Sequence, residues 1–138
     1  AAGVRASLDD GASPEAARAA LKAVLNALVD LQIGGRRSDV WMSFVLREIA
    51  EQGPAYQLLF EQLWSPGVDL IAGLIGRITR EAPGAAPARI QALLLLSSLS
   101  AFSLARPIAL KYLGWPRLTE ARLGEIKAML ARQIEQIA

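Results

Sequence analysis

Hydrophobic residues recur along this chain at the three- and four-residue spacings of helices, and proline and glycine divide them into segments. The first segment begins at Ser13-Pro14-Glu15, which combines a serine N-cap, a proline at the first helical position and an acid in the first turn. Apolar positions then keep a helical period until Gly34-Gly35. The pattern predicts a first helix between these two signals.

A second helix is predicted from about residue 36 to 52. Gly53-Pro54 ends it and starts a short third helix, and Ser65-Pro66 repeats the start signal for a fourth. The spacing predicts a buried stripe on the second helix that contains Val40, Phe44 and either Leu46 or Ile49.

Pro87 opens a long fifth helix that Gly114 and Pro116 close, and Thr119 is placed as the N-cap of a sixth. An alternating pattern of the kind that predicts β-strands does not appear over any useful length. The sequence therefore predicts an all-α fold of six helices joined by short loops.

The fifth helix contains the most apolar part of the chain, with 16 uncharged residues from Ile90 to Ala105 between Arg89 and Arg106. A membrane span needs about 20 mostly apolar residues, and Pro107 interrupts the continuation. We therefore expect a buried helix of a soluble domain. Because a helix that is apolar all round must be covered on every side, a partner subunit is the natural cover for part of it.

Two features favour a contact between two copies of the chain. Ser97, Ala101 and Ala105 recur every four residues, which lets another helix approach closely. The sixth helix has an apolar seam of two to three heptads, which suits a four-helix bundle made by two chains. The same seam could simply pack on the core of its own domain, and the pattern leaves both readings open. The predicted dimer contact consists of Ser97, Ala101, Leu104, Ile126, Leu130, Ile134 and Ile137.

Composition limits the possible functions. The 138 residues form one domain, and 53% of them are hydrophobic, so some apolar surface is expected to meet another chain or a ligand. The net charge is +2 and the longest basic run is Arg36-Arg37, which excludes a phosphate-tracking stripe. The chain has no cysteine and no histidine, which removes thiol nucleophiles, Ser-His-Asp relays and nearly every zinc site. We expect neither an enzyme nor a bound metal or cofactor.

The aromatic residues suggest a binding pocket. All eight lie between Trp41 and Trp115, and the first helix offers mostly Ala and Leu to face them. They could form a plain core or line a small-molecule site. Arg106 could form an ion pair with Glu48 or Glu51, or bind an acidic ligand. The predicted ligand-binding residues are Trp41, Phe44, Glu48, Tyr56, Phe60, Trp64, Phe102 and Arg106.

Two segments, VLREIAEQGPAYQLLFEQLWSPGVDLIAGLIGRI and FSLARPIALKYLGWPRLTEARLGEIKAML, resemble the C-terminal domain of tetracycline-repressor (TetR) family transcriptional regulators, in the CerR/CecR-like branch. REIAEQGPA and LARP-xAL-xx-LGW carry the match, which extends from about Leu21 to the C-terminus. The resemblance implies a cytoplasmic bacterial homodimer in which the last two long helices, here 89–114 and 119–137, form an intermolecular bundle. It also implies that a small hydrophobic or aromatic effector changes the separation of two DNA-binding heads.

Residues 1–12 are too short and too polar for such a head. On the resemblance they are the linker from a missing N-terminal DNA-binding domain, and residues 13–138 are the effector-binding and dimerisation domain. The protein, a repressor on this interpretation, would then bind operator DNA only through the missing domain and would not contact a membrane.

The alternative is a ligand-free helical adaptor with a solid core whose apolar surface binds another protein.

Overall fold

The computed structural model describes residues 13–34, 38–82 and 84–138, without the side chains at 38, 39, 41, 42 and 49. Within these ranges all regular elements are helical, which confirms the predicted all-α class. The elements are α2 (Pro14–Val29), the π-helical turn η1 (Asp30–Gly34), α3 (Ser38–Glu51), α4 (Tyr56–Leu59), the π-helical turn η2 (Phe60–Trp64), α5 (Ser65–Thr79), α6 (Ala86–Leu104), α7 (Arg106–Leu113) and α8 (Glu120–Glu135).

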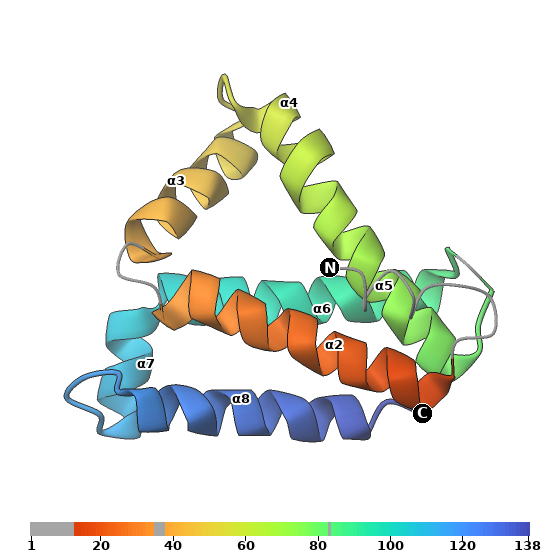
Figure 1. The fold of residues 1–138 in the computed structure, drawn as a ribbon. Helices are drawn as coiled ribbons and strands as arrows, with labels where there is room; N and C mark the ends of the chain where they lie inside the picture. The colour runs from red at the N-terminus through yellow and green to blue at the C-terminus, as the bar shows by residue number, and fades with distance from the viewer. Residues whose placement is uncertain (1–12, 35–37, 83) are drawn as a thin grey trace.

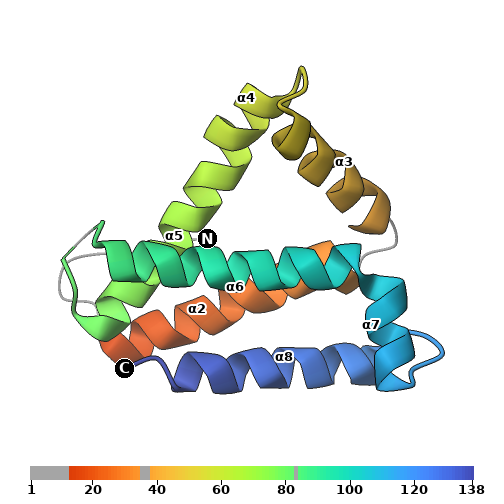
Figure 2. The ribbon, with the colours of Figure 1, turned by 180° about the vertical axis from the view of Figure 1, so that it is seen from behind.

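The helices form an arch on a two-layered base (Figures 1 and 2). The base consists of α2 and α6 with α8 below them, and α7 connects the end of α6 to the start of α8. The arch rises on the other side, with α3 as one limb and the continuous run of α4, η2 and α5 as the other. The lower part of α5 packs against both α2 and α6.

The hydrophobic core lies where α2, α5, α6 and α8 meet. Its fully buried side chains include Leu21 and Leu25 of α2, Leu74 and Ile75 of α5, and Ile134 of α8. These residues follow the helical spacing in the sequence, because the buried face of each helix turns toward the same centre. Of the arch, α5 belongs to this core, whereas the described side chains of α3 and α4 lie outside it.

The predicted starts of the first and last helices are confirmed. The Ser13 hydroxyl oxygen accepts a hydrogen bond from the Ala16 N–H at 3.0 Å, and the Thr119 hydroxyl oxygen accepts one from the Arg122 N–H at 3.3 Å. Each bond satisfies a backbone donor that a helix start leaves without an intrahelical partner.

The predicted break at Ser65-Pro66 is wrong, because α4, η2 and α5 run on as one helix from Tyr56 to Thr79. A proline inside a helix removes one N–H and presses its ring on the preceding turn. Here the preceding turn widens to the π form, in which the Ser65 N–H bonds to the Phe60 carbonyl. The wider turn makes room for Pro66 without ending the helix.

The predicted single helix from Pro87 to Gly114 is also wrong, because it divides at Ala105 (φ −92°, ψ 17°) into α6 and α7. Pro107 cannot continue the hydrogen-bond ladder, and α7 turns away from α6 (Figure 2). One pair of predicted helices is thus joined and another helix is split. The described residues therefore keep the predicted total of six helical runs.

The predicted buried stripe on α3 is wrong at Val40, and its alternative member Leu46 is half-buried. Val45 is buried, whereas Val40 is 66% exposed and Phe44 is half-buried. The side chain of Ile49 lies outside the described part. α3 is one limb of the arch and contacts α6 and η1 of the base, and the spacing alone does not identify the face that makes these contacts.

Two helical runs, Tyr56–Thr79 and Ala86–Leu104, are long and apolar enough to cross a membrane by length and composition alone. Core helices of soluble proteins pass the same test. In α6 the two sides differ: Ala92 and Leu99 are buried against the rest of the domain, whereas Leu94 and Leu104 are more than 60% exposed. α6 thus belongs to the core on one side and has an uncovered apolar side on the other.

Candidate functional site

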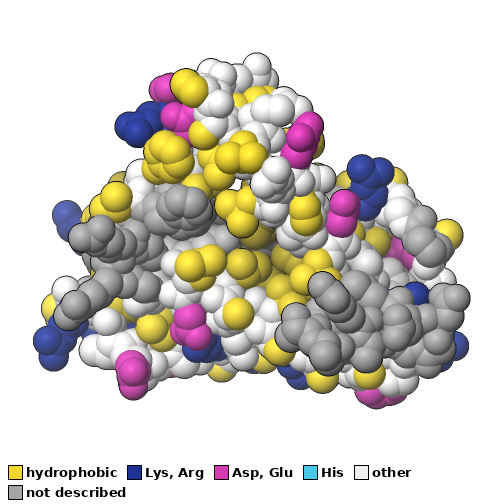
Figure 3. Space-filling model, turned by 45° about the horizontal axis from the view of Figure 1, so that its top comes forward, with side chains coloured by type: hydrophobic (Ala, Val, Ile, Leu, Met, Phe, Trp, Pro, Cys, Tyr) yellow, Lys and Arg dark blue, Asp and Glu magenta, His cyan; other side chains and the backbone are white. Residues whose placement is uncertain are grey.

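A cavity of about 210 Å³ lies beneath the arch, where it meets the base. Figure 3 shows hydrophobic side chains gathered in the hollow between the arch and the base. Six elements contribute to its wall, so the cavity depends on the tertiary arrangement rather than on any one helix. The lining residues are Val24, Leu28, Leu31, Gln32, Val45, Leu46, Leu63, Trp64, Gly67, Leu70, Ile71, Leu96 and Ser100.

Gln32 and Ser100 are the two polar side chains of this wall. Gln32 is only 7% exposed, and its side-chain oxygen accepts a long hydrogen bond of 3.5 Å from the Ser100 hydroxyl. No partner for the Gln32 side-chain NH₂ is found among the described residues. Since no fully buried side-chain nitrogen there lacks a partner, this NH₂ group retains accessible surface in the cavity wall.

The backbone around Gln32 is held firmly. The Ser103 hydroxyl, itself buried, donates to the Gln32 carbonyl at 2.6 Å, and the Arg106 guanidinium donates to the Ile33 carbonyl at 2.9 Å. Helix ends leave such carbonyls without intrahelical partners, and these two side chains supply them. The end of the first helix is thus fastened to the junction between α6 and α7.

A second, apolar groove of about 380 Å³ lies on the other side of α6, against α8. Phe102, Leu113, Trp115 and Met129 are among its lining residues, and the Arg122 guanidinium lies 5.3 Å from the centre of the Trp115 ring. A third hollow, of about 420 Å³, lies where α5 ends and α6 begins.

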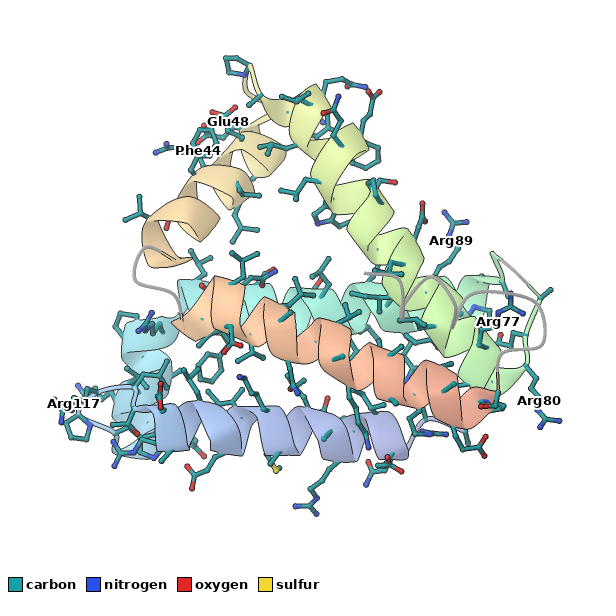
Figure 4. All side chains as sticks on the ribbon, in the orientation of Figure 1. Phe44, Glu48, Arg77, Arg80, Arg89 and Arg117 are labelled. Carbon is teal, nitrogen blue, oxygen red and sulfur yellow. The ribbon has the colours of Figure 1, made fainter. Side chains whose placement is uncertain are left out.

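Charges of both signs line the third hollow, among them Asp69, Arg77, Glu81 and Arg89. Arg80 lies at the same end of the molecule, and Arg117 lies at the opposite end (Figure 4). The described residues include no group of three or more Asp or Glu side chains that could hold a metal ion.

A model of the C-terminal domain of the helix–turn–helix (HTH) transcriptional dual regulator CecR, a TetR-family protein, matches residues 17–138. The chain belongs to this family. The comparisons with curated proteins and with solved structures found no match. A CecR C-terminal domain is part of a transcription regulator.

The CecR-family domain brings one predicted aromatic residue, Trp64, into the wall of the arch cavity. Tyr56, Phe60 and Trp64 stack in sequence along one limb of the arch, with ring centres 6.1 and 5.8 Å apart. Phe60 is 38% exposed, and Phe44 lies on the outer side of α3 (Figure 4). Phe102 lines the groove beside α8 instead, and the side chain of Trp41 lies outside the described part.

The two predicted polar ligand contacts, Glu48 and Arg106, lie elsewhere in the CecR-family domain. The Glu48 carboxylate accepts a hydrogen bond from the Ala55 N–H at 3.2 Å and thereby helps to close the apex of the arch. Arg106 meets the Ile33 carbonyl instead of the expected carboxylate of Glu48 or Glu51. Neither of the two lines the arch cavity.

The residues of the predicted dimer contact divide into two groups. Leu130, Ile134 and Ile137 are buried in the core of the single chain, and Arg18 of α2 donates to the carbonyls of Ile134 and Ile137. A second chain could contact these three side chains only if this packing opened. Ile126 is half-buried, whereas the other members, Ser97, Ala101 and Leu104, are exposed on α6.

Sequence reasoning missed Gln32 and Ser100. Gln32 follows Leu21, Leu25 and Leu28 at helical spacing, so it is a polar residue in an apolar position. A polar residue at an apolar helical position could have identified Gln32 as a candidate site residue. Ser100 was harder to find, because it is one of four serines in α6 and only the fold shows which of them faces the cavity.

Proposed function

We propose that this CecR-family domain binds a small, mostly apolar effector in the arch cavity and forms a homodimer through the exposed side of α6 and α7. The observation that carries the effector proposal is the cavity itself, a mostly apolar space lined by a nine-tenths-buried glutamine. Ligand sites in proteins combine apolar walls with a few convergent polar groups in this way.

In the proposed mechanism, effector binding favours one position of the arch relative to the base. The end of α2 reaches the cavity wall through η1, and its start follows the proposed linker, residues 1–12. A change at η1 would therefore alter the spacing of two DNA-binding heads that precede the linkers. In this proposal the heads bind operator DNA, and the protein is a cytoplasmic bacterial repressor. The size of this effect is limited by the difference in effector affinity between the two arrangements.

The exposed apolar side of α6 and α7 supports the dimer. Leu94, Leu104 and Ile108 are 66%, 61% and 74% exposed, and Tyr112 is 89% exposed. Several large apolar side chains exposed on neighbouring helices are typical of a protein interface. The small residue Ala101 lies on the same side and would permit close approach of a second helix.

Filling the cavity tests the effector proposal. A Cβ atom built at Gly67, which lines the cavity, meets no atom within 4 Å, so a larger side chain has room to start there and Gly67→Leu is expected to fill part of the space. Titration calorimetry with toluene should show binding to the wild type and at least tenfold weaker binding to this variant. The variant should not be less stable, because leucine replaces a helical glycine at a gain of up to about 1 kcal/mol.

Gly124→Leu is the matched control. Gly124 is an exposed glycine of α8 where a built Cβ atom also has no neighbour within 4 Å, and it does not line the cavity. It should bind toluene as the wild type does. Equal toluene affinities in all three proteins would place the ligand outside the arch cavity and contradict the proposal.

A ligand-free adaptor is the second candidate, because Leu58 and Leu63 of the arch are 58% and 48% exposed and could contact another protein. In that case no small apolar probe should bind, and Leu58→Glu should remove the interaction with the partner protein.

A further inference from the structure

We infer that the effector is a compact, uncharged and mostly apolar molecule with one hydrogen-bond acceptor, such as an aryl ketone or ester, whose oxygen accepts from the Gln32 side-chain NH₂ group. This inference rests on the proposed function, since it takes the arch cavity as the effector site.

The size of the ligand follows from the volume of the cavity. An apolar cavity of about 150 Å³ in another protein binds benzene. The arch cavity, of about 210 Å³, therefore suits a single substituted ring or an aliphatic molecule of similar bulk.

The expected lack of charge on the ligand follows from the residues that line the cavity. None of the described lining residues is acidic or basic. Glu48 is bonded at the apex, and Arg106 is occupied by the Ile33 carbonyl. A carboxylate or ammonium group in this space would lose its hydration without gaining an opposite charge, which makes its transfer from water very unfavourable.

The Gln32 side-chain NH₂ group is the reason to expect a hydrogen-bond acceptor on the ligand. The Gln32 side-chain oxygen already receives the Ser100 proton, and the Gln32 carbonyl receives that of Ser103, so the side-chain NH₂ is left to donate. A ligand that covers this donor cuts it off from water, which is costly if the donor gains no partner, and a ligand oxygen placed against it removes that cost. A purely hydrocarbon ligand would leave it unsatisfied.

The test compares acetophenone with α-methylstyrene, which has a CH₂ group in place of the carbonyl oxygen, and with benzoate. Titration calorimetry at pH 7 gives the three dissociation constants for the wild type and for Gln32→Met, which keeps the side-chain length and removes the amide. The ratio of the α-methylstyrene constant to the acetophenone constant should fall at least fivefold in the variant. Comparing this ratio in the wild type and in the variant cancels the difference in hydration free energy between the two probes.

Benzoate should bind the wild type at least tenfold more weakly than acetophenone. Gln62→Met is the matched control, because Gln62 is an exposed glutamine of η2 that does not line the cavity, and it should keep the wild-type ratio. A fallen ratio in Gln32→Met alone would support the inference, and an equal fall in Gln62→Met would overturn it.

A second measurement needs no variant. The infrared carbonyl stretch of acetophenone bound to the wild type should lie below its frequency in hexane, as hydrogen bonding to the oxygen requires. A hexane-like frequency together with an unchanged ratio would overturn the acceptor while leaving the arch cavity as an effector site. If none of the three probes binds and Gly67→Leu changes nothing, the effector site itself is wrong and the inference is overturned with it.

Discussion

Glu48 shows how one carboxylate holds two helices at an angle. It lies near the end of α3, and its Oε2 accepts from the Ala55 N–H at the start of the other limb of the arch. Gly53 lies between them, and a Cβ atom at this position would overlap the Glu48 carboxylate. The small residue and the acid therefore form one unit at the apex.

This unit predicts non-additive effects on stability. Glu48→Ala should lower the free energy of unfolding by about 1 kcal/mol, because it removes the acceptor of a helix-start N–H. Gly53→Ala should cost a similar amount by displacing the carboxylate, and the double variant should cost little more than either change alone. Urea denaturation measures all three, with Glu51→Ala, an exposed acid one turn away, as the control. Strictly additive losses would contradict the coupling.

Glu135 of α8 predicts a pH dependence. The hydrogen bond from Lys22 of α2, together with its charge, lowers the pKa of the Glu135 carboxyl from its ordinary value. A carboxyl with a lowered pKa stabilises the fold above its unfolded-state pKa, and this contribution is lost as the pH falls through the folded value. Since both side chains are partly exposed, the contribution is small and sensitive to salt.

Thermal unfolding between pH 6 and pH 3 tests this dependence. Glu135→Gln should have a lower Tm than the wild type near pH 6, and the two Tm values should converge as the pH falls below about 4.3, the ordinary pKa of glutamate. Glu125→Gln, an exposed position on the same helix, serves as the reference. A constant difference in Tm across this range would show that the ionised carboxylate is not the cause.

At the scale of elements, the junction between α6 and α7 is also the anchor of the first helix. Ser103, near the end of α6, and Arg106, at the start of α7, donate to consecutive carbonyls of η1. Pro107 provides the break that brings both donors to the same helix end. The kink of α6 and the position of Gln32 are therefore linked by direct hydrogen bonds.

Removing one of these bonds should loosen the anchor. Ser103→Ala leaves the Gln32 carbonyl in a buried place without its partner, so the free energy of unfolding should fall by about 1 to 2 kcal/mol. Ser97→Ala changes an exposed serine of the same helix and should alter stability by less than about 0.5 kcal/mol. Urea denaturation curves compare the two, and equal losses would contradict the anchoring role of Ser103.

Pro66 and Pro107 show how far the sequence determines the elements. Both prolines predict a helix boundary by position, yet only Pro107 marks one, because the turn before Pro66 widens instead. Helical period and capping residues identified the all-α class and both terminal helix starts. Whether a turn can widen depends on its packing in the folded chain, which local spacing does not encode.

The candidate site was less predictable than the fold for a related reason. Aromatic content located the arch helices, but the tilt of each limb decides which side faces inward, so Trp64 lines the cavity whereas Phe60 is partly exposed. Trp41 stays a prediction. Among the described side chains of α3 only Val45 is buried, and the apolar period of this helix therefore says little about its orientation.

For the whole molecule, α6 is the helix on which both proposed activities meet. Leu96 and Ser100 of this helix line the cavity, whereas Leu94 and Leu104 are exposed. This explains why the helix is apolar all round without requiring a membrane: one side faces the domain, and a second copy of the chain would cover the other. A displacement of α6 by an effector would then reach the dimer contact directly.

The proposed dimer gives the last prediction. Native mass spectrometry of the wild-type chain should show a dimer, and Ala101→Trp should convert it to a monomer, because an indole on the exposed side of α6 would hold two closely packed helices apart. Ala27→Trp places the same side chain on an exposed position of α2 and should leave the dimer intact.

Because Ala101 is exposed in the single chain, its replacement should barely change the unfolding of the monomer, so loss of the dimer mass would report the interface. A dimer that persists in Ala101→Trp would place the contact on another surface, and a monomeric wild type would leave the apolar side of α6 to a different partner protein.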